Sequence, residues 1–200
     1  MDGPETLMTM ARTDFVDRSP LTRDALAFAT RWHEGQTRDT DSIPFLTHPV
    51  EVACLLHEAG YSDDVVAAGV LHDVLEDTEV ERAELEERFG PEVARLVAAV
   101  SDDPAIEDHA ERKAALRAQV AAASKDAAAV FAADKVSKTR EMRVRLAHGR
   151  FERRDRAKID HYEASLTLLD ELVPGHRLVD LLRTELQGLV EQPVGPVHGS

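Results

Sequence analysis

The sequence predicts an all-α protein, a single bundle of about eight to nine helices. The 200-residue chain is 43% hydrophobic but only 4% aromatic, so Ala, Val and Leu must fill its core. Only ten Gly and nine Pro interrupt it, and the long Ala/Leu/Glu/Arg runs between them favour helix. There is no alternation of strand and helix patterns and no internal repeat, so one helical domain is expected.

The first two expected helices have clear boundaries. Ser19-Pro20 combines an N-cap with a proline at the first helical position, and apolar residues follow at helical spacing to about Gln36. A polar loop comes next. The second helix begins near His48 and ends before Gly60, which suits the position just past a helix C-terminus.

The third expected helix, DVVAAGVLHDVLED, follows Asp63, which can cap it. It is apolar on almost every side until His72, which places it at the centre of the fold. Two shorter helices, ERAELEERFG and PEVARLVAAV, are separated at Gly90-Pro91. Four more helices are expected near residues 109–123, 126–149, 152–172 and 176–190.

The expected domain organisation is simple. Residues 1–18 show no periodicity and should be loose, residues 19–190 should form the one domain, and residues 191–200 should be a flexible tail. No stretch of 18 apolar residues occurs and the N-terminus has no apolar core, so neither a membrane span nor a signal peptide is expected.

The charge balance limits the partners. Subtracting 38 Asp and Glu from 24 Lys and Arg leaves −14, which argues against nucleic acid and anionic membranes as partners. A small phosphorylated substrate responds to local charge and is not excluded. The single cysteine, Cys54, lies in the apolar run VACLL, where it should be a buried hydrophobe, as suits a reducing cytoplasm.

Four titratable residues crowd the end of the third expected helix. His72-Asp73 closes its apolar part, and Glu76 and Asp77 follow, with Asp73 and Asp77 on one helix face. Groups of this kind at the edge of a core are costly to bury unless they are paired or bound to a cation. The alternative is a helix C-terminus with ordinary solvated charges.

Two further residues favour the cation. His48 stands at a helix start after an apolar segment, and Asp134 interrupts the apolar run VFAADKV, where a buried acid needs a partner. Each alone would be read as a cap or a structural group. Joined with His72 and Asp73, they form a set of two imidazoles and two carboxylates that suits Mn²⁺, Fe²⁺, Zn²⁺ or Ni²⁺.

This pattern, His…His-Asp…Asp, resembles that of the HD-domain phosphohydrolase superfamily. The wider sequence is similar to the hydrolase domain of RelA/SpoT homologues and to the small stand-alone alarmone hydrolases. The similarity extends over about residues 22–145, and more weakly to about 190. Five segments carry it in order: HEGQTR, IPFLTHPVEVACLL, VVAAGVLHDVLEDT, ERFGPEV and FAADKVSKTREM.

The resemblance implies a helical HD-domain bundle in which a catalytic Mn²⁺ is held by four ligands. It also implies that Glu76 and Asp77 position and activate the attacking water. Such a division of labour is chemically sound, because a divalent ion acidifies its bound water and a carboxylate can accept the proton. The implied metal ligands are His48, His72, Asp73 and Asp134.

The substrate implied by the resemblance is guanosine tetra- or pentaphosphate, which loses its 3′-pyrophosphate, with Arg38 lying against the base. Another phosphorylated nucleotide, such as NADPH or a nucleoside phosphate, is an alternative within the same enzyme class. A nucleotide-sensing module that has lost catalysis is an alternative of another class. The retained Glu76-Asp77 pair argues against a sensor, which has no need to activate water.

Local charge indicates where phosphates would bind. Residues 135–158 contain ten Lys or Arg and three Glu or Asp, which gives +7 in a chain of −14. Lys138 and Arg140 follow Asp134 closely and are the candidate phosphate ligands. Lys158 and Tyr162 share one face of a later helix and are expected to reach the same pocket.

The sequence departs from the family pattern near the expected substrate. Lys138 stands where the family has an asparagine that contacts the nucleotide, and Phe45 stands where a tyrosine is usual. The loop segment RDTDSIP is one residue longer than usual and lacks glycine. These changes bear on substrate specificity and leave the expected metal ligands in place.

Overall fold

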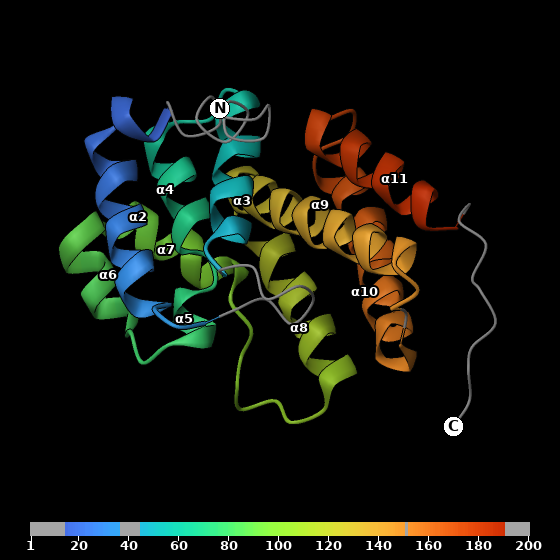
Figure 1. Ribbon diagram of the computed structural model, residues 1–200. Coiled ribbons are helices and arrows are strands. Elements are labelled where there is room, and N and C mark those ends of the chain that lie inside the picture. Colours follow the sequence, from blue (N-terminus) through green and yellow to red (C-terminus); the bar gives the residue numbers. More distant parts are fainter. Residues whose placement is uncertain (1–14, 37–44, 151, 191–200) are drawn as a thin grey trace.

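The computed structural model describes residues 15–36, 45–150 and 152–190, and this part of the chain is helical without any strand (Figure 1). The expected all-α fold is confirmed. The helices are α2 (Pro20–Trp32), α3 (Thr47–Glu58), α4 (Asp63–Leu71), α5 (Val74–Asp77), α6 (Arg82–Phe89), α7 (Pro91–Val100), α8 (His109–Ala122), α9 (Lys125–Ala147), α10 (Arg153–Leu172) and α11 (Arg177–Val190).

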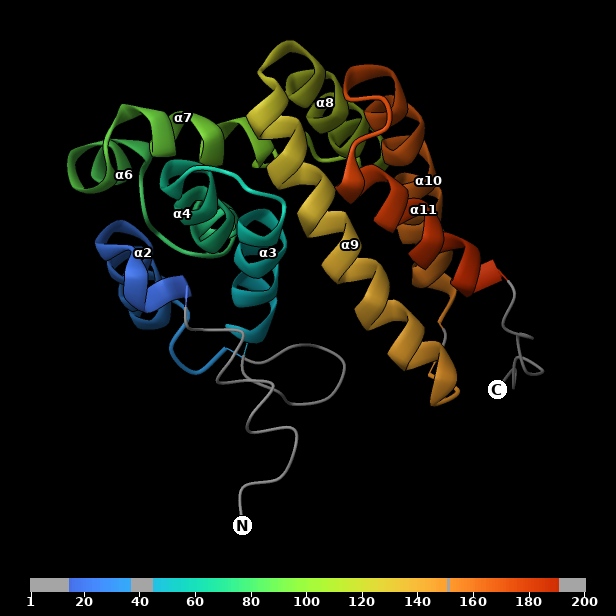
Figure 2. The ribbon, with the colours of Figure 1, turned by 90° about the horizontal axis from the view of Figure 1, so that it is seen from above.

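The 23-residue helix α9 is the centre of the fold. It runs obliquely through the molecule, with α2, α3, α4, α6 and α7 on one side and α10 and α11 on the other (Figure 2). It packs directly on α3, α4, α7, α8, α10 and α11. Because neighbours surround it, α9 is buried on several faces, and this explains its Ala-rich first half, Ala127–Ala133.

Most expected boundaries agree with the structure. The Ser19 side chain caps α2 by accepting a hydrogen bond from the Thr22 backbone, and Gly60 follows the end of α3 with a φ of 84°. Two details differ. Helix α2 ends at Trp32 rather than near Gln36, and the N-cap of α4 is Ser62, with Asp63 as the first helical residue.

The third expected helix is broken at His72-Asp73 into α4 and the short α5, so one continuous helix to residue 77 was wrong. The His72 ring explains the break. Its Nδ1 hydrogen-bonds the Gly69 carbonyl at 2.8 Å, the group that the Asp73 backbone N–H would bind in a continuous helix. The ring therefore replaces a helical hydrogen bond, and the chain turns where two adjacent side chains must face inward.

At the N-terminal side, packing begins before residue 19, where the expected domain starts. Residues 15–18 are helical, Phe15 and Val16 are buried, and Phe15 stacks on His57 on α3 with ring centroids 4.9 Å apart. The rest of the expected loose segment and the whole expected tail, residues 191–200, lie outside the described residues. Cys54 is buried, as expected.

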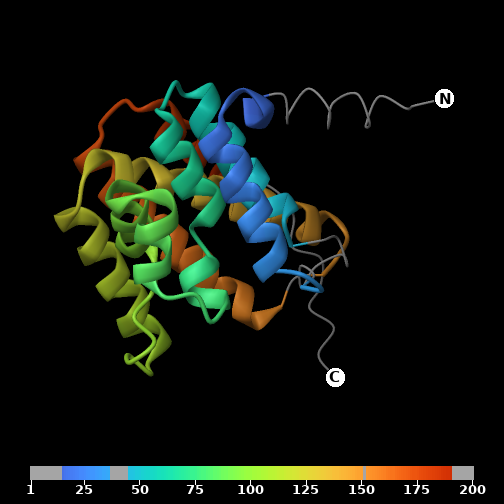
Figure 3. The same cartoon turned by 90° about the vertical axis from the view of Figure 1, so that its left-hand side faces the viewer.

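Helices α2 and α3 both pack on α4, and α2 lies beside α4 (Figure 3). Gly69 permits the close approach of α4 to α3, because a Cβ built there would meet Leu56 Cδ1 at 2.5 Å. Within the described parts of the chain, no helix has the length and apolar character needed to cross a membrane.

The close contact at Gly69 predicts sensitivity to added volume. We expect Gly69→Val to lower the free energy of unfolding by about 1–3 kcal/mol, the usual cost of overpacking a dense core. Urea denaturation followed by circular dichroism measures the change. In a Leu56→Ala background, which removes the clashing methyl group, the penalty should shrink. An equal penalty in both backgrounds would contradict this account.

Candidate functional site

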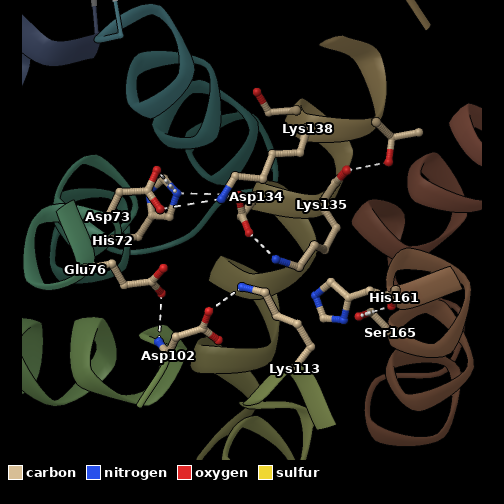
Figure 4. Close-up of polar contacts among 12 residues, drawn as sticks. His72, Asp73, Glu76, Asp102, Lys113, Asp134, Lys135, Lys138, His161 and Ser165 are labelled. Carbon is tan, nitrogen blue, oxygen red and sulfur yellow. Dashed lines mark hydrogen bonds and ion pairs between the residues drawn. The ribbon is translucent and has the colours of Figure 1, made fainter. Parts of the chain in front are cut away.

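Four buried side chains from three separate parts of the fold meet beside α9. His48 lies at the start of α3, His72 and Asp73 lie at the break between α4 and α5, and Asp134 lies on α9. Figure 4 shows His72, Asp73 and Asp134 turned toward one another. The sequence-based grouping of these four residues therefore agrees with their placement.

The atoms of the cluster are close together. His48 Nε2 lies 3.1 Å from His72 Nε2, 3.4 Å from Asp73 Oδ2 and 3.2 Å from Asp134 Oδ1. His72 Nε2 lies 3.1 Å from Asp73 Oδ2 and 3.5 Å from Asp134 Oδ1. One ligand atom from each of His48, His72 and Asp134 lies within 4.8 Å of the others, the spacing of a candidate metal site.

The electrostatics of the cluster favour a positive charge. Burial alone would lower the pKa of His72, but the charges of Asp73 and Asp134 outweigh it and raise this pKa to about 10. Burial alone would raise the pKa of Asp134, yet Lys135 and Lys138 hold it well below its ordinary value. The two buried carboxylates are thus ionised and attract any nearby proton or cation.

The donor set fits a divalent metal ion. Among the described residues, none donates a well-aligned hydrogen bond to the buried Asp134 Oδ1, although Lys138 Nζ lies 2.9 Å away. The Nδ1–H of His72 is committed to the Gly69 carbonyl, so a metal ion that displaces the proton of Nε2 would bind through that atom. Two imidazole nitrogens and two carboxylate oxygens suit a transition metal with further positions open to water.

A cavity of about 610 Å³ adjoins the cluster at His48. Five cationic side chains and two acidic ones are among the described residues of its wall, so the wall carries an excess of positive charge. This charge contrasts with the net −14 of the whole chain. The described wall residues are Gln36, Phe45, His48, Asp77, His109, Lys113, Lys135, Lys138, Glu141, Met142, Arg145, Lys158, His161 and Tyr162.

The expected water-activating carboxylates lie at the rim of this site. Asp77 lines the cavity, and Glu76 Oε1 accepts a 2.8 Å hydrogen bond from the Asp102 backbone (Figure 4). Partial desolvation and the nearby charge of Asp73 raise the pKa of Glu76 and of Asp77. The side-chain carboxylate of Asp102 in turn forms an ion pair with Lys113.

Three of the residues expected to bind the substrate line the cavity, and Arg140 is not among the described residues of its wall. Lys138, Lys158 and Tyr162 all line the cavity, and the Lys138 ammonium also contacts Asp134 and Asp73. Arg140, also an expected phosphate ligand, lies two residues past Lys138 and pairs with Glu51 and Glu185, because helix positions i and i+2 point in different directions.

The remaining expectation, Arg38, and the unusual loop of residues 39–43 lie outside the described residues. Phe45, where the family usually has tyrosine, lines the cavity and contacts the ring of His33 with centroids 4.6 Å apart.

Sequence reasoning missed several residues of the cavity wall, among them Lys135, Lys113 and His161. Lys135 is buried, with Nζ 2.5 Å from Asp134 Oδ2 and 4.5 Å from the centre of the Phe131 ring. Its position next to Asp134 was the available signal. Lys113 and His161 reach the cavity from α8 and α10, and no local motif marks them.

The chain belongs to the HD domain family, whose pattern matches residues 25–158. Human guanosine-3′,5′-bis(diphosphate) 3′-pyrophosphohydrolase MESH1 is 41% identical over 122 residues, which are 60% of this chain and 68% of that protein. Bifunctional (p)ppGpp synthase/hydrolase SpoT of Escherichia coli K12 is 44% identical over 85 residues, 42% of this chain and 12% of SpoT.

A solved structure, described as a metazoan orthologue of SpoT that hydrolyses ppGpp, shares this fold with a TM-score of 0.74. It is 26% identical in sequence, and the match covers 86% of this chain and 97% of that one. The family resemblance inferred from the five sequence segments is confirmed by these matches.

The buried His161 predicts a pH dependence of stability. Burial and the charges of Lys135, Lys113 and Arg117 lower the pKa of His161 to about 2. An unfolded chain binds a proton there below pH about 6.5, whereas the native state does not, so this group costs stability as the pH falls below that value. At pH 5.5 the expected cost is about 1.4 kcal/mol.

Replacing His161 with Asn keeps an acceptor for Arg117, whose Nη1 bonds His161 Nδ1 at 2.7 Å. We expect His161→Asn to flatten the decline of the melting temperature between pH 7.5 and 5.5. His148→Asn, at an exposed position, is the matched control. An unchanged slope in the first variant would show that His161 does not carry this dependence.

Proposed function

We propose that this protein is a Mn²⁺-dependent hydrolase that removes the 3′-pyrophosphate of guanosine tetra- and pentaphosphate. The observation that carries the proposal is the buried cluster of two imidazoles and two carboxylates beside a cavity walled by cationic side chains. The names of the MESH1 and SpoT relatives support this choice of substrate.

In this proposal His48, His72, Asp73 and Asp134 hold the ion. The mixed nitrogen and oxygen donors, with no thiolate among them, suit Mn²⁺. The bound ion would acidify a water and polarise a phosphoryl oxygen. The close packing of the four ligands around α9 keeps their donor atoms in place.

Glu76 and Asp77 are proposed to accept the proton of the attacking water. The backbone N–H of Asp102 orients the Glu76 carboxylate, and Asp77 is exposed to the cavity. The raised pKa of each group brings it nearer to neutrality, which makes each a better proton acceptor than an ordinary surface carboxylate.

The cavity wall is proposed to hold the substrate's phosphates. Lys138 lies next to the metal ligands, and Lys158 and Lys113 extend the positive charge along the wall. Burial raises the pKa of Tyr162, so its hydroxyl remains a hydrogen-bond donor at neutral pH. Arg38 is proposed to lie against the base, as the family resemblance implies.

A second candidate substrate class is another phosphorylated nucleotide, such as NADPH or a nucleoside polyphosphate. Lys138 favours it, because an ammonium attracts any phosphate and carries no code for the base or sugar. The excess of acidic residues argues against nucleic acid or an anionic membrane as a partner. The lone thiol Cys54 favours a reducing compartment such as the cytoplasm.

The proposed activity is tested by incubating the purified protein with Mn²⁺ and a panel of guanosine tetraphosphate, NADPH and GTP. We expect guanosine tetraphosphate to yield GDP and pyrophosphate in equal amounts, and chromatography of the products measures both. Turnover of NADPH or GTP alone would replace the alarmone with the second candidate class. No turnover of any member would contradict the proposal.

The metal ligands and the proton acceptors should separate in a mutational test. We expect His72→Ala and Asp73→Ala to abolish binding of about one divalent ion per chain, as measured by elemental analysis. Glu76→Gln and Asp77→Asn should retain the metal and lower turnover about 10²-fold, the usual effect of losing a general base. Normal turnover in both of the latter variants would assign proton transfer to another group.

Lys138 should determine how broadly the enzyme acts. We expect Lys138→Asn to lower kcat/KM on NADPH and GTP more than on guanosine tetraphosphate, because the amide restores the family's residue. Steady-state kinetics on the three substrates gives the ratios. An equal loss on all three would make Lys138 a general phosphate ligand, and no change would show that its ammonium serves only Asp134 and Asp73.

A further inference from the structure

We propose that Glu51 and Ser137 act as positioning residues for His48, by fixing which of its ring nitrogens carries the proton. This inference rests on the proposed metal site and concerns two residues outside the set of four proposed metal ligands. Glu51 lies one turn after His48 on α3, and Ser137 lies one turn after Asp134 on α9.

The three side chains form a continuous chain of hydrogen bonds. His48 Nδ1 lies 2.9 Å from Ser137 Oγ, and Ser137 Oγ donates to Glu51 Oε2 at 2.8 Å. His48 and Ser137 are each no more than 3% exposed. Bulk water therefore has little access to these bonds, and their polarity is set by the protein.

The number of available protons determines which atom donates and which accepts in each of these hydrogen bonds. An ionised carboxylate can only accept hydrogen bonds, and a serine has one hydroxyl proton. Since Ser137 gives that proton to Glu51, its oxygen must accept the proton on His48 Nδ1. His48 Nε2 is then left with a lone pair, and this is the atom that faces His72, Asp73 and Asp134.

Arg140 holds the outer end of the chain. Its Nη1 donates to Glu51 Oε1 at 2.9 Å, and its Nε donates to Glu185 Oε1 at 2.8 Å. Arg140 thus holds Oε1 of Glu51 and leaves Oε2 turned toward Ser137. Arg140 therefore acts on the metal ligand His48 through Glu51 and Ser137.

The two histidines of the cluster are therefore oriented by different means. The Nδ1 of His72 is fixed by the backbone carbonyl of Gly69, which no side-chain substitution removes. The Nδ1 of His48 is fixed by side chains alone. Partners of this kind, which orient a metal-binding histidine, are worth about 10–100-fold in metal affinity.

The decisive variant is Glu51→Gln, which preserves shape but reverses the chain. Arg140 donates to the side of residue 51 that it faces, so the glutamine must turn its oxygen to Arg140 and its NH₂ group to Ser137. Ser137 would then donate to His48 Nδ1, and the proton would move to Nε2, where it blocks the metal. We expect Mn²⁺ affinity, measured by isothermal titration calorimetry, to fall 10–100-fold.

Ser137→Ala tests the same chain without changing any charge. It should also lower Mn²⁺ affinity 10–100-fold, because His48 Nδ1 loses its acceptor. Glu58→Gln, on the exposed end of α3, and Ser165→Ala, a buried serine whose hydroxyl donates to the His161 carbonyl within α10, are the matched controls and should bind Mn²⁺ as the wild type does. Circular dichroism melting of every variant identifies any that fails to fold.

Nitrogen-15 NMR of the metal-free chain at pH 8 reads the proton position directly. We expect the wild-type His48 to carry its proton on Nδ1 and Glu51→Gln to move it to Nε2. The double variant Glu51→Gln, Arg140→Met frees the amide to turn its oxygen to Ser137, so the Nδ1–H form should return together with part of the Mn²⁺ affinity.

The outcomes distinguish the hydrogen-bond relay, from Arg140 through Glu51 and Ser137 to His48, from the metal site on which it depends. If Glu51→Gln and Ser137→Ala bind Mn²⁺ as tightly as the wild type while His72→Ala does not, the metal site stands and the relay is overturned. A wild-type His48 with no proton on Nδ1 also overturns the relay. If His72→Ala binds Mn²⁺ normally, the proposed metal site itself fails.

Discussion

The burial of two carboxylates within a few ångströms of the same two imidazoles is the constraint on which the rest of the site depends. Asp73 and Asp134 remain ionised away from water, a state that is costly unless positive charge is close. Lys135 and Lys138 provide part of that charge from the same helix. The cationic wall of the cavity is thus continuous with the compensation that the metal ligands already require.

The break between α4 and α5 has the same origin. A continuous helix would direct His72 and Asp73 about 100° apart, whereas the turn brings both side chains to His48. The helical hydrogen bond lost at Gly69 is replaced by one from the His72 ring, so the turn leaves that carbonyl satisfied. The break in the helix is therefore also the feature that orients His72 and Asp73.

Periodicity and capping residues were enough to predict the helices and most of their ends, because these depend on neighbours within a few positions. The same reasoning brought His48, His72, Asp73 and Asp134 together, since each was an anomaly in an apolar setting. It did not foresee that Arg140 pairs with Glu51 and Glu185, because a count of charges along the sequence does not give the direction of a side chain on its helix. It could not find Lys113 or His161, whose roles arise only when α8 and α10 pack beside α9.

Helix α9 carries Asp134, Ser137 and Lys138, so the number of helical residues that precede them determines the direction in which all three side chains point. An inserted or deleted residue near Lys125 would rotate all three by about 100° relative to α3 and α4. The same change beyond Arg145, the last residue of α9 in the cavity wall, would leave them in place and shift only the end of the helix. Length variation in this protein should therefore be tolerated at one end of α9 and excluded at the other.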